Sequence, residues 1–119
     1  PATLDAAALT VMAARGQITG ALVDGPRAFD NGISPEAVAT KGIASQVAGE
    51  ADILVVPDLE AGNMLAKQLI YFAGATAAGL VLGARVPIVL TSRADPLSAR
   101  IASAALAKLV AVRKAEGKA

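Results

Sequence analysis

The sequence has 119 residues, enough for one domain, and its 55% apolar and 18% charged residues exclude a disordered chain. Eleven basic and ten acidic residues give a net charge of +1, and aromatic residues make up 3%, so we expect no nucleic-acid partner. The chain has no Cys and no His, which removes thiol nucleophiles, the commonest general base and the commonest metal ligand, so we expect no metal site.

The first elements are predicted from capping residues and short apolar runs. Thr3 is a good N-cap for a helix over about 4–15, which Gly16 would end. The apolar run 20–23, closed by the turn residues 24–26, predicts a buried strand.

A loop is predicted over residues 27–33, before a second helix. Ser34 followed by Pro35 is a typical helix start, and this short helix should end near Gly42. The strongest strand signal is the apolar run 52–56, which Pro57 and Asp58 close.

The second half of the chain predicts a helix over about 59–73, strands over 78–82 and 88–91, and a final helix. Asp95 is the expected cap of that last helix, with Pro96 at its first position. The alternation of helices and strands indicates an α/β fold with a mostly parallel sheet and flanking helices. The link 83–87 is too short for a parallel crossover, so the last two strands must pair antiparallel or belong to different sheets.

Three loops follow strand ends, where parallel α/β sheets bind their ligands. They are 24–26, 57–63 and 91–96. The third loop carries the Ser92 hydroxyl, the Arg93 guanidinium and free N–H groups of a helix start, a combination that can hold a phosphate or a developing oxyanion.

Simpler interpretations compete at each of these positions. Asp58 and Asp95 are good helix caps, and Asp24 before Gly-Pro is ordinary turn chemistry. Arg93 alone is typical of a solvated surface arginine, and Asn63 in a first helical turn can face solvent. No Gly-x-Gly-x-x-Gly or Walker motif is present, so the residues alone indicate an anion-binding α/β domain.

Four sequence blocks follow one another along the chain: Val-Asp-Gly-Pro-Arg-Ala-Phe-Asp-Asn (23–31), Ile-Ser-Pro-Glu-Ala (33–37), the run 41–63 and Val-Leu-Thr-Ser-Arg-Ala-Asp (89–95). In this order they closely resemble the phosphate acetyl/butyryltransferase family, particularly its butyryltransferase-like branch, which includes proteins with an upstream enoyl-CoA hydratase-like module. The resemblance runs from about Thr3 to Val112, and its most specific parts are Pro-Asp-Leu-Glu-Ala-Gly-Asn and Ser-Arg.

The resemblance implies a two-domain subunit of the isocitrate/isopropylmalate dehydrogenase-like type, with an active site between the domains, and dimers. It implies that residues 1–85 belong to the second domain, that residues 86–119 return to the first, and that the rest of the first domain is missing here. The chain opens at Pro1 without Met, which indicates a fragment.

The resemblance also implies the reaction and its residues. A short acyl group, acetyl or butyryl, would move between coenzyme A and inorganic phosphate, so acyl-CoA, phosphate and acyl phosphate are the expected partners, with coenzyme A a substrate and no cofactor. Ser92 and Arg93 would be catalytic. Asp24, Asp58, Asn63 and Asp95 are the candidate substrate-binding residues. The family's candidate base falls at or beside Ala99, so either Asp95 substitutes or the thiol loses its proton otherwise.

Two other functions stay open: a non-catalytic metabolite- or anion-binding module of the same fold, and an unrelated oxidoreductase with a similar α/β half. The longest uncharged stretch, 69–84, has 16 residues, fewer than the roughly 20 that a membrane span needs. With no visible targeting segment, a cytoplasmic location without a membrane partner is expected.

Overall fold

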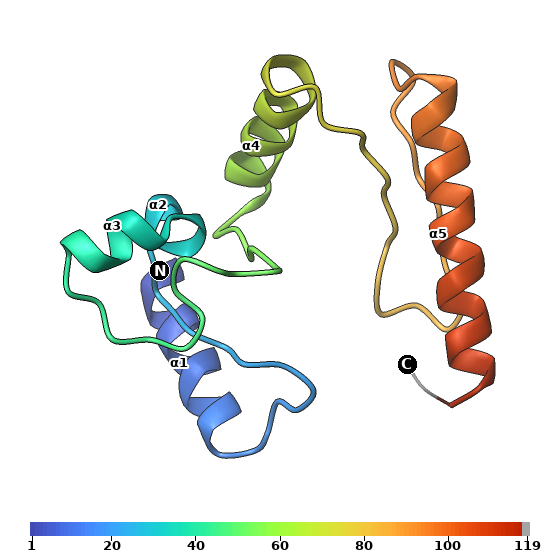
Figure 1. The fold of residues 1–119 in the computed structure, drawn as a ribbon. Helices are drawn as coiled ribbons and strands as arrows, with labels where there is room; N and C mark the ends of the chain where they lie inside the picture. The colour runs from blue at the N-terminus through green and yellow to red at the C-terminus, as the bar shows by residue number, and fades with distance from the viewer. Residues whose placement is uncertain (118–119) are drawn as a thin grey trace. The chain divides into compact units, whose positions relative to one another are not determined.

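The computed structural model describes residues 1–117. Its contacts divide the chain into two compact units, Pro1–Asn63 and Met64–Ala119, which are described separately (Figure 1). Within the described residues the helices are α1 (Ala2–Ala14), α2 (Phe29–Ile33), α3 (Pro35–Thr40), α4 (Leu59–Phe72) and α5 (Leu97–Ala115).

Helix α1 starts earlier than its capping signal predicted. The helix begins at Ala2 directly after Pro1, without a side-chain cap, so Thr3 lies inside the first turn and the predicted Thr3 cap is wrong. Its end is as expected, because Gly16 takes a φ of 75°. Positive φ is the conformation that glycine adopts at helix ends without a steric cost.

The predicted loop over 27–33 contains the short helix α2. Gly32 within this run has low helix propensity, so the local sequence gave little signal for a helix. Contacts from farther along the chain hold it instead. The N–H of Gly49 donates to Asn31 O at 2.8 Å, and the N–H of Ala51 donates to Gly32 O at 3.0 Å.

Helices α3 and α4 begin where the sequence predicted. The Ser34 hydroxyl accepts a hydrogen bond from the N–H of Ala37 at 3.2 Å, with Pro35 at the first helical position. Asp58 caps α4 in the same way, since its Oδ1 accepts from the N–H of Ala61 at 2.7 Å. A side-chain cap of this kind satisfies one of the free N–H groups at a helix start.

The α/β prediction is only partly matched by this chain. The segments predicted as strands are irregular chain in Figure 1, and the β pairing within residues 1–117 is a single antiparallel bridge between Val81 and Ile88. The bridge agrees with antiparallel pairing of the last two predicted strands. A strand needs a partner for its N–H and C=O groups, and 20–23 and 52–56 have none among the described residues.

The second unit is held together along α5. The Ser103 hydroxyl, 1% exposed, donates to Ala99 O at 2.7 Å and accepts from the N–H of Gly79 at 3.0 Å. Farther along, Lys114 Nζ donates to Ala84 O at 2.8 Å. The chain is therefore fastened to the helix at one residue before the bridge, Gly79, and at one between its two members, Ala84.

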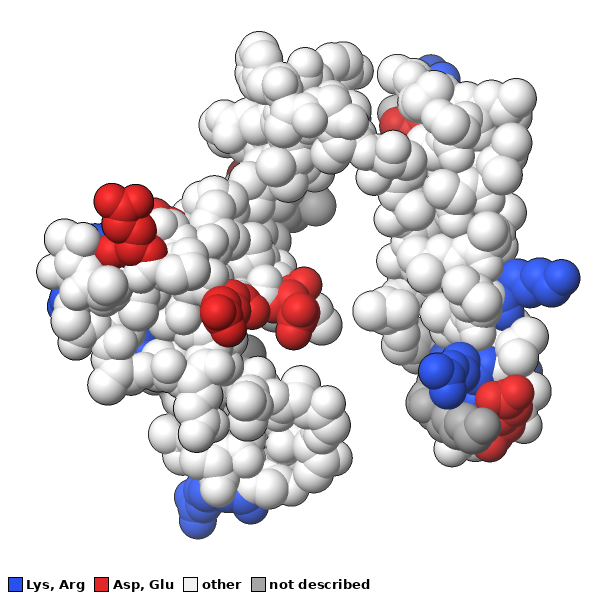
Figure 2. All heavy atoms as spheres, in the orientation of Figure 1, with Lys and Arg blue, Asp and Glu red and all other residues white. Residues whose placement is uncertain are grey.

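Little apolar surface is buried in either unit. Within residues 1–117, Ala99 is the one buried apolar residue, at 4% exposure. Large apolar side chains remain exposed in both units, including Val55 at 85% and Phe72 at 89%. Charged side chains form small separate groups on the face that Figure 2 shows, and most of that face is uncharged.

Candidate functional site

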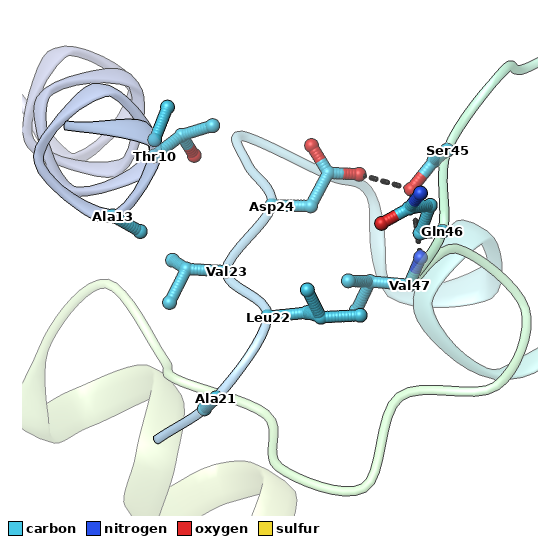
Figure 3. Close-up of a pocket in the computed structure, with 10 residues that line it drawn as sticks. Thr10, Ala13, Ala21, Leu22, Val23, Asp24, Ser45, Gln46 and Val47 are labelled. Atoms are coloured by element: carbon cyan, nitrogen blue, oxygen red, sulfur yellow. Dashed lines mark hydrogen bonds between the residues drawn. The ribbon is translucent and has the colours of Figure 1, made fainter. Parts of the chain in front are cut away.

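Asp24 lies in the first unit, directly after the predicted strand 20–23. Its Oδ2 accepts from the Ser45 hydroxyl at 2.5 Å (Figure 3). The same oxygen accepts from Arg27 Nε at 2.9 Å. The Arg27 Nη2 atom lies 2.8 Å from the same oxygen, and the Asp24 side chain is 19% exposed. The carboxylate is therefore fixed by a hydroxyl and a guanidinium that both use one of its oxygens.

These neighbours set the charge state of Asp24. Partial burial by itself raises the pKa of this carboxyl, but the hydrogen bonds from Ser45 and Arg27, the Arg27 charge and the Gly25 N–H lower the pKa below its usual value. Asp24 is therefore a carboxylate at neutral pH, which can accept hydrogen bonds but is a weak proton acceptor.

Backbone contacts hold the Asp24 turn against α1. The Thr10 hydroxyl bonds to Gly25 O at 3.1 Å and to Ala6 O, its own helix, at 3.0 Å. A Cβ added at Gly25 would lie 3.3 Å from the Ala6 side chain, so the turn passes close to the helix. Ser45 is itself fixed, because its Oγ accepts from the N–H groups of Val47 and Ala48, both at 3.0 Å.

Ser92, Arg93 and Asp95 form a tight turn in the second unit, before α5. Asp95 Oδ2 accepts from the Ser92 N–H at 2.7 Å, and Ser92 O accepts from the Asp95 N–H at 3.1 Å. The predicted Asp95 cap is therefore wrong: α5 begins after Pro96 without a side-chain cap, because the carboxylate is engaged by the turn. The Ser92 hydroxyl is exposed, with one weak contact from the Ala94 N–H at 3.4 Å.

The Arg93 side chain is exposed, and its guanidinium forms no hydrogen bond or ion pair within residues 1–117. Arg93 O accepts one weak hydrogen bond from Arg100 Nη2, at 3.4 Å. A guanidinium has five N–H donors in a planar fork that matches phosphate oxygens. The turn therefore presents an unengaged guanidinium and a hydroxyl on adjacent residues.

The remaining predicted positions are less structured. Asp58 Oδ1 is used in the α4 cap, and Asn63 is an exposed residue in the second turn of α4. Ala99 is buried in α5, so the position where the family resemblance expects a base holds a methyl group. Among the described residues, no group of three or more Asp or Glu side chains could hold a metal ion.

The structure thus gathers the predicted residues into separate sets. Asp24, Asp58 and Asn63 belong to the first unit, while Ser92, Arg93 and Asp95 belong to the second. The sequence reasoning missed Arg27 and Ser45. Arg27 stands three residues after Asp24, a usual distance for an ion pair across a turn, whereas nothing local links Ser45 to Asp24 twenty-one residues earlier.

Another feature of the described chain concerns membranes: none of its helices within residues 1–117 combines the length and the apolar character that a membrane span requires.

Comparisons with known proteins agree with the sequence blocks. The family model described as "Phosphate acetyl/butaryl transferase" matches residues 1–108. A phosphate acetyltransferase of Rickettsia felis is 67% identical over 110 residues, which are 92% of this chain and 32% of the relative. A probable phosphate butyryltransferase of Bacillus subtilis is 57% identical over 106 residues, 89% of this chain and 36% of the relative.

A solved structure is also similar. The crystal structure of a branched-chain phosphotransacylase from Enterococcus faecalis has a TM-score of 0.77 and 39% identity, and the match covers 91% of this chain and 38% of that one. The chain therefore spans about a third of the length of the curated relatives it matches.

Proposed function

Because this chain belongs to the phosphate acetyl/butyryltransferase family, we propose that its protein transfers a short acyl group between coenzyme A and inorganic phosphate. A phosphate oxygen attacks the thioester carbonyl, the C–O bond forms as the C–S bond breaks, and the products are acyl phosphate and the CoA thiol. The observation that carries the proposal is the match over residues 1–108, which includes the Ser92–Arg93 turn. Relatives named for acetyl and for butyryl transfer both support a short acyl chain.

Ser92 and Arg93 are the proposed catalytic residues. In the transition state, negative charge grows on the carbonyl oxygen and remains on the phosphate. A positioned guanidinium stabilises such charge, and the serine hydroxyl can orient the carbonyl by a hydrogen bond. The turn fixed by Asp95 supports these roles, since it holds the backbone while leaving the Arg93 side chain free for a ligand.

Asp24, Asp58, Asn63 and Asp95 are proposed to bind substrate. Asp58 combines this role with its cap of α4. Asp95 is the candidate base in place of the residue that the resemblance expects at Ala99, because a methyl group cannot accept a proton. When CoA attacks acyl phosphate, Asp95 takes the thiol proton, and in the direction written above it returns a proton to the leaving thiolate. Coenzyme A acts in this reaction as a substrate, and no cofactor is required.

We propose that residues 1–85 belong to the second domain of a two-domain subunit and that residues 86–119 return to the first domain. The parallel sheet of the isocitrate/isopropylmalate dehydrogenase-like fold would form when the remaining chain pairs with segments such as 52–56. The exposure of Val55 and its apolar neighbours supports this. A cytoplasmic dimer is part of the same proposal.

A second candidate is a metabolite- or anion-binding module that has lost turnover. Ala99 favours it, since the expected base position is empty. The two candidates differ in one measurement, the formation of acyl phosphate.

The test compares the full-length protein with this chain. Both are incubated with acetyl-CoA or butyryl-CoA and phosphate, and acyl phosphate is trapped with hydroxylamine while the released thiol is counted. The full-length protein should turn over, and the chain alone should not, because half of the proposed cleft lies outside it. A full-length protein that binds CoA without turnover would establish the binding module, and robust turnover by the chain alone would overturn the two-domain proposal.

A further inference from the structure

A hollow of about 280 Å³ lies beside Asp24 in the first unit (Figure 3). Its apolar walls are the small residues of α1 and the side chains after it, Ala13, Ala21, Leu22 and Val23. Asp24, Ser45 and Gln46 contribute polar groups. The hollow is thus mainly apolar, with a charged acceptor on one wall, which is the usual make-up of a small-molecule site.

The two oxygens of Asp24 are used differently. Ser45 and Arg27 both donate to Oδ2. The other oxygen points away from Ser45 in Figure 3, and no side chain of residues 1–117 donates to it. The hydroxyl and the guanidinium therefore fix the carboxylate and leave Oδ1 with capacity for a donor from outside the chain.

The unused acceptor oxygen of Asp24 decides which substrate group can bind there. The lowered pKa keeps this group ionised at neutral pH. The Arg27 guanidinium balances this charge, so the free oxygen selects for a hydrogen-bond donor. The oxygens of ionised phosphate groups are mainly acceptors, whereas amide N–H and hydroxyl groups donate. Of the two substrates, the neutral arm of coenzyme A, which carries two amides and a hydroxyl between the nucleotide and the thiol, meets this requirement.

From this geometry we infer that the hollow binds the amide-bearing arm of coenzyme A, with Asp24 Oδ1 accepting a hydrogen bond from an N–H or O–H of the arm. The inference rests on the proposed function, to which it adds where one part of one substrate binds. Phosphate would bind at the Arg93 turn instead. Arg27 is then a positioning residue, since it holds Asp24 and does not line the hollow, whereas Ser45 both holds Asp24 and forms part of the wall.

The size of the hollow fits binding of the arm rather than of complete coenzyme A. Sites for whole drug-sized ligands usually measure about 300–1,000 Å³. At about 280 Å³ the hollow is too small for complete coenzyme A and has room for a chain segment. Ala13 and Ala21 line the hollow with small side chains, so a larger side chain at either position would reduce its volume.

The experiment measures binding of CoA and of its nucleotide half, 3′,5′-ADP, to the full-length protein by calorimetry. Asp24→Asn removes the charge, and Ala13→Leu fills the hollow. Asp30→Asn and Ala8→Leu are the matched controls: Asp30 pairs with Lys41 outside the hollow, and Ala8 is an exposed α1 residue that does not line it. Circular dichroism verifies that each variant is folded.

Asp24→Asn should weaken CoA binding by roughly 10- to 100-fold, the effect of losing a hydrogen bond to a charged group. Ala13→Leu should weaken CoA binding as well. The affinity of both variants for 3′,5′-ADP, and the affinity of both control variants for CoA, should stay near the values of the unsubstituted protein. In turnover, KM for acyl-CoA should rise by a similar factor, with KM for phosphate within about twofold. If Ala13→Leu does not fold, Asp24→Asn decides.

Unchanged CoA affinity in the folded variants, or an equal loss for 3′,5′-ADP, would overturn the inference. Such a result leaves the proposed function standing. Conversely, if the full-length protein without substitutions forms no acyl phosphate, the proposed function is wrong. The affinities of the variants for CoA and 3′,5′-ADP then still decide whether the arm binds in the hollow.

Discussion

Ser92 and Arg93 are neighbours in one turn, but the Ser92 backbone is hydrogen-bonded while the Arg93 side chain is not. The Ser92 N–H donates to the Asp95 carboxylate, and the Asp95 N–H donates back to Ser92 O. The Arg93 side chain, by contrast, forms no hydrogen bond or ion pair within the described residues. A fixed backbone limits where the guanidinium can reach. Its charge can then be positioned for a substrate at little cost to folding.

Replacing Arg93 tests this role in the full-length enzyme. Arg93→Ala should lower kcat by about 10²–10³, the usual effect of removing a preorganised donor. Arg93→Lys should restore only part of the rate, because an ammonium keeps the charge without the two-pronged geometry. Kinetics in both directions and urea unfolding give the measurement; unchanged kcat/KM for Arg93→Ala would place the active site elsewhere.

Asp24 and Asp30 are carboxylates whose neighbours lower the pKa. For Asp30 the cause is the hydrogen bond and charge of Lys41, whose Nζ also donates to Asn31 Oδ1 at 2.8 Å. Because the pKa is lower in the folded protein than in the unfolded chain, the folded state binds fewer protons than the unfolded state at acidic pH. The resulting stability is present above the unfolded pKa and is lost as the pH falls through the folded value.

Acid should therefore destabilise the first unit partly through these two groups. Between pH 7 and pH 3, Asp24→Asn and Asp30→Asn should each lose less unfolding free energy than the unchanged protein, because neither amide can be protonated in this range. Urea unfolding of the full-length protein at several pH values measures the difference. An acid response identical to that of the unchanged protein would show that these pairs do not contribute.

The helices that the sequence predicted well begin with local signals. Ser34 and Asp58 both cap the helices that follow them, and the capping hydrogen bonds span only three residues. Asp95 carries the same signal, yet its carboxylate bonds to Ser92. Caps and turns compete for the same side chains, and sequence alone does not say which hydrogen bond forms.

Long-range contacts explain what the sequence could not predict. Helix α2 depends on residues 49–51, and Asp24 depends on Ser45. Each of these pairs is separated by eighteen to twenty-one residues, beyond any local pattern. The predicted strand ends indicated the three loops that hold the candidate residues and, by themselves, only an anion-binding domain. The roles of Ser92 and Arg93 in acyl transfer depend on the order of the four sequence blocks.

Ser103 shows how α5 and the preceding chain are matched in length. Five residues separate Gly79 from Ala84, and eleven separate their partners Ser103 and Lys114. At 1.5 Å per residue, eleven helical residues span about 16 Å, while 79–84 could reach about that distance at full extension and bends at Gly83, where φ is 87°. The two contacts can therefore be made together, which aligns the chain with the helix.

Removing the Ser103 hydroxyl should weaken this alignment. Ser103→Ala leaves the Gly79 N–H without its partner and should reduce the unfolding free energy by about 1 kcal/mol. Ser98→Ala is the matched control, since Ser98 is an exposed residue of the same helix with no hydrogen-bond partner for its side chain in residues 1–117. Urea unfolding compares the two variants, and equal stability would argue against the contribution of the Gly79 contact.

At the scale of the molecule, the amount of exposed surface is high. The chain exposes 9079 Å². Two separate compact bodies, each with half of the 11.8 kDa mass, would together expose about 7,100 Å² by the scaling of surface with mass. The additional surface includes many apolar side chains, in agreement with a chain that spans about a third of its relatives.

The run 52–56 carries a further consequence of this exposure, one that concerns handling the chain by itself. Ile53 and Val55 are 78% and 85% exposed, and the backbone beside them has no strand partner among the described residues. Open backbone next to apolar, β-branched side chains is a template for edge-to-edge pairing between copies.

The isolated chain should therefore aggregate at high concentration. A single charge, Val55→Lys, should delay this in light scattering, whereas Val11→Lys on α1 should have little effect. An equal delay of aggregation in the two variants would show that copies pair through a surface outside the run 52–56.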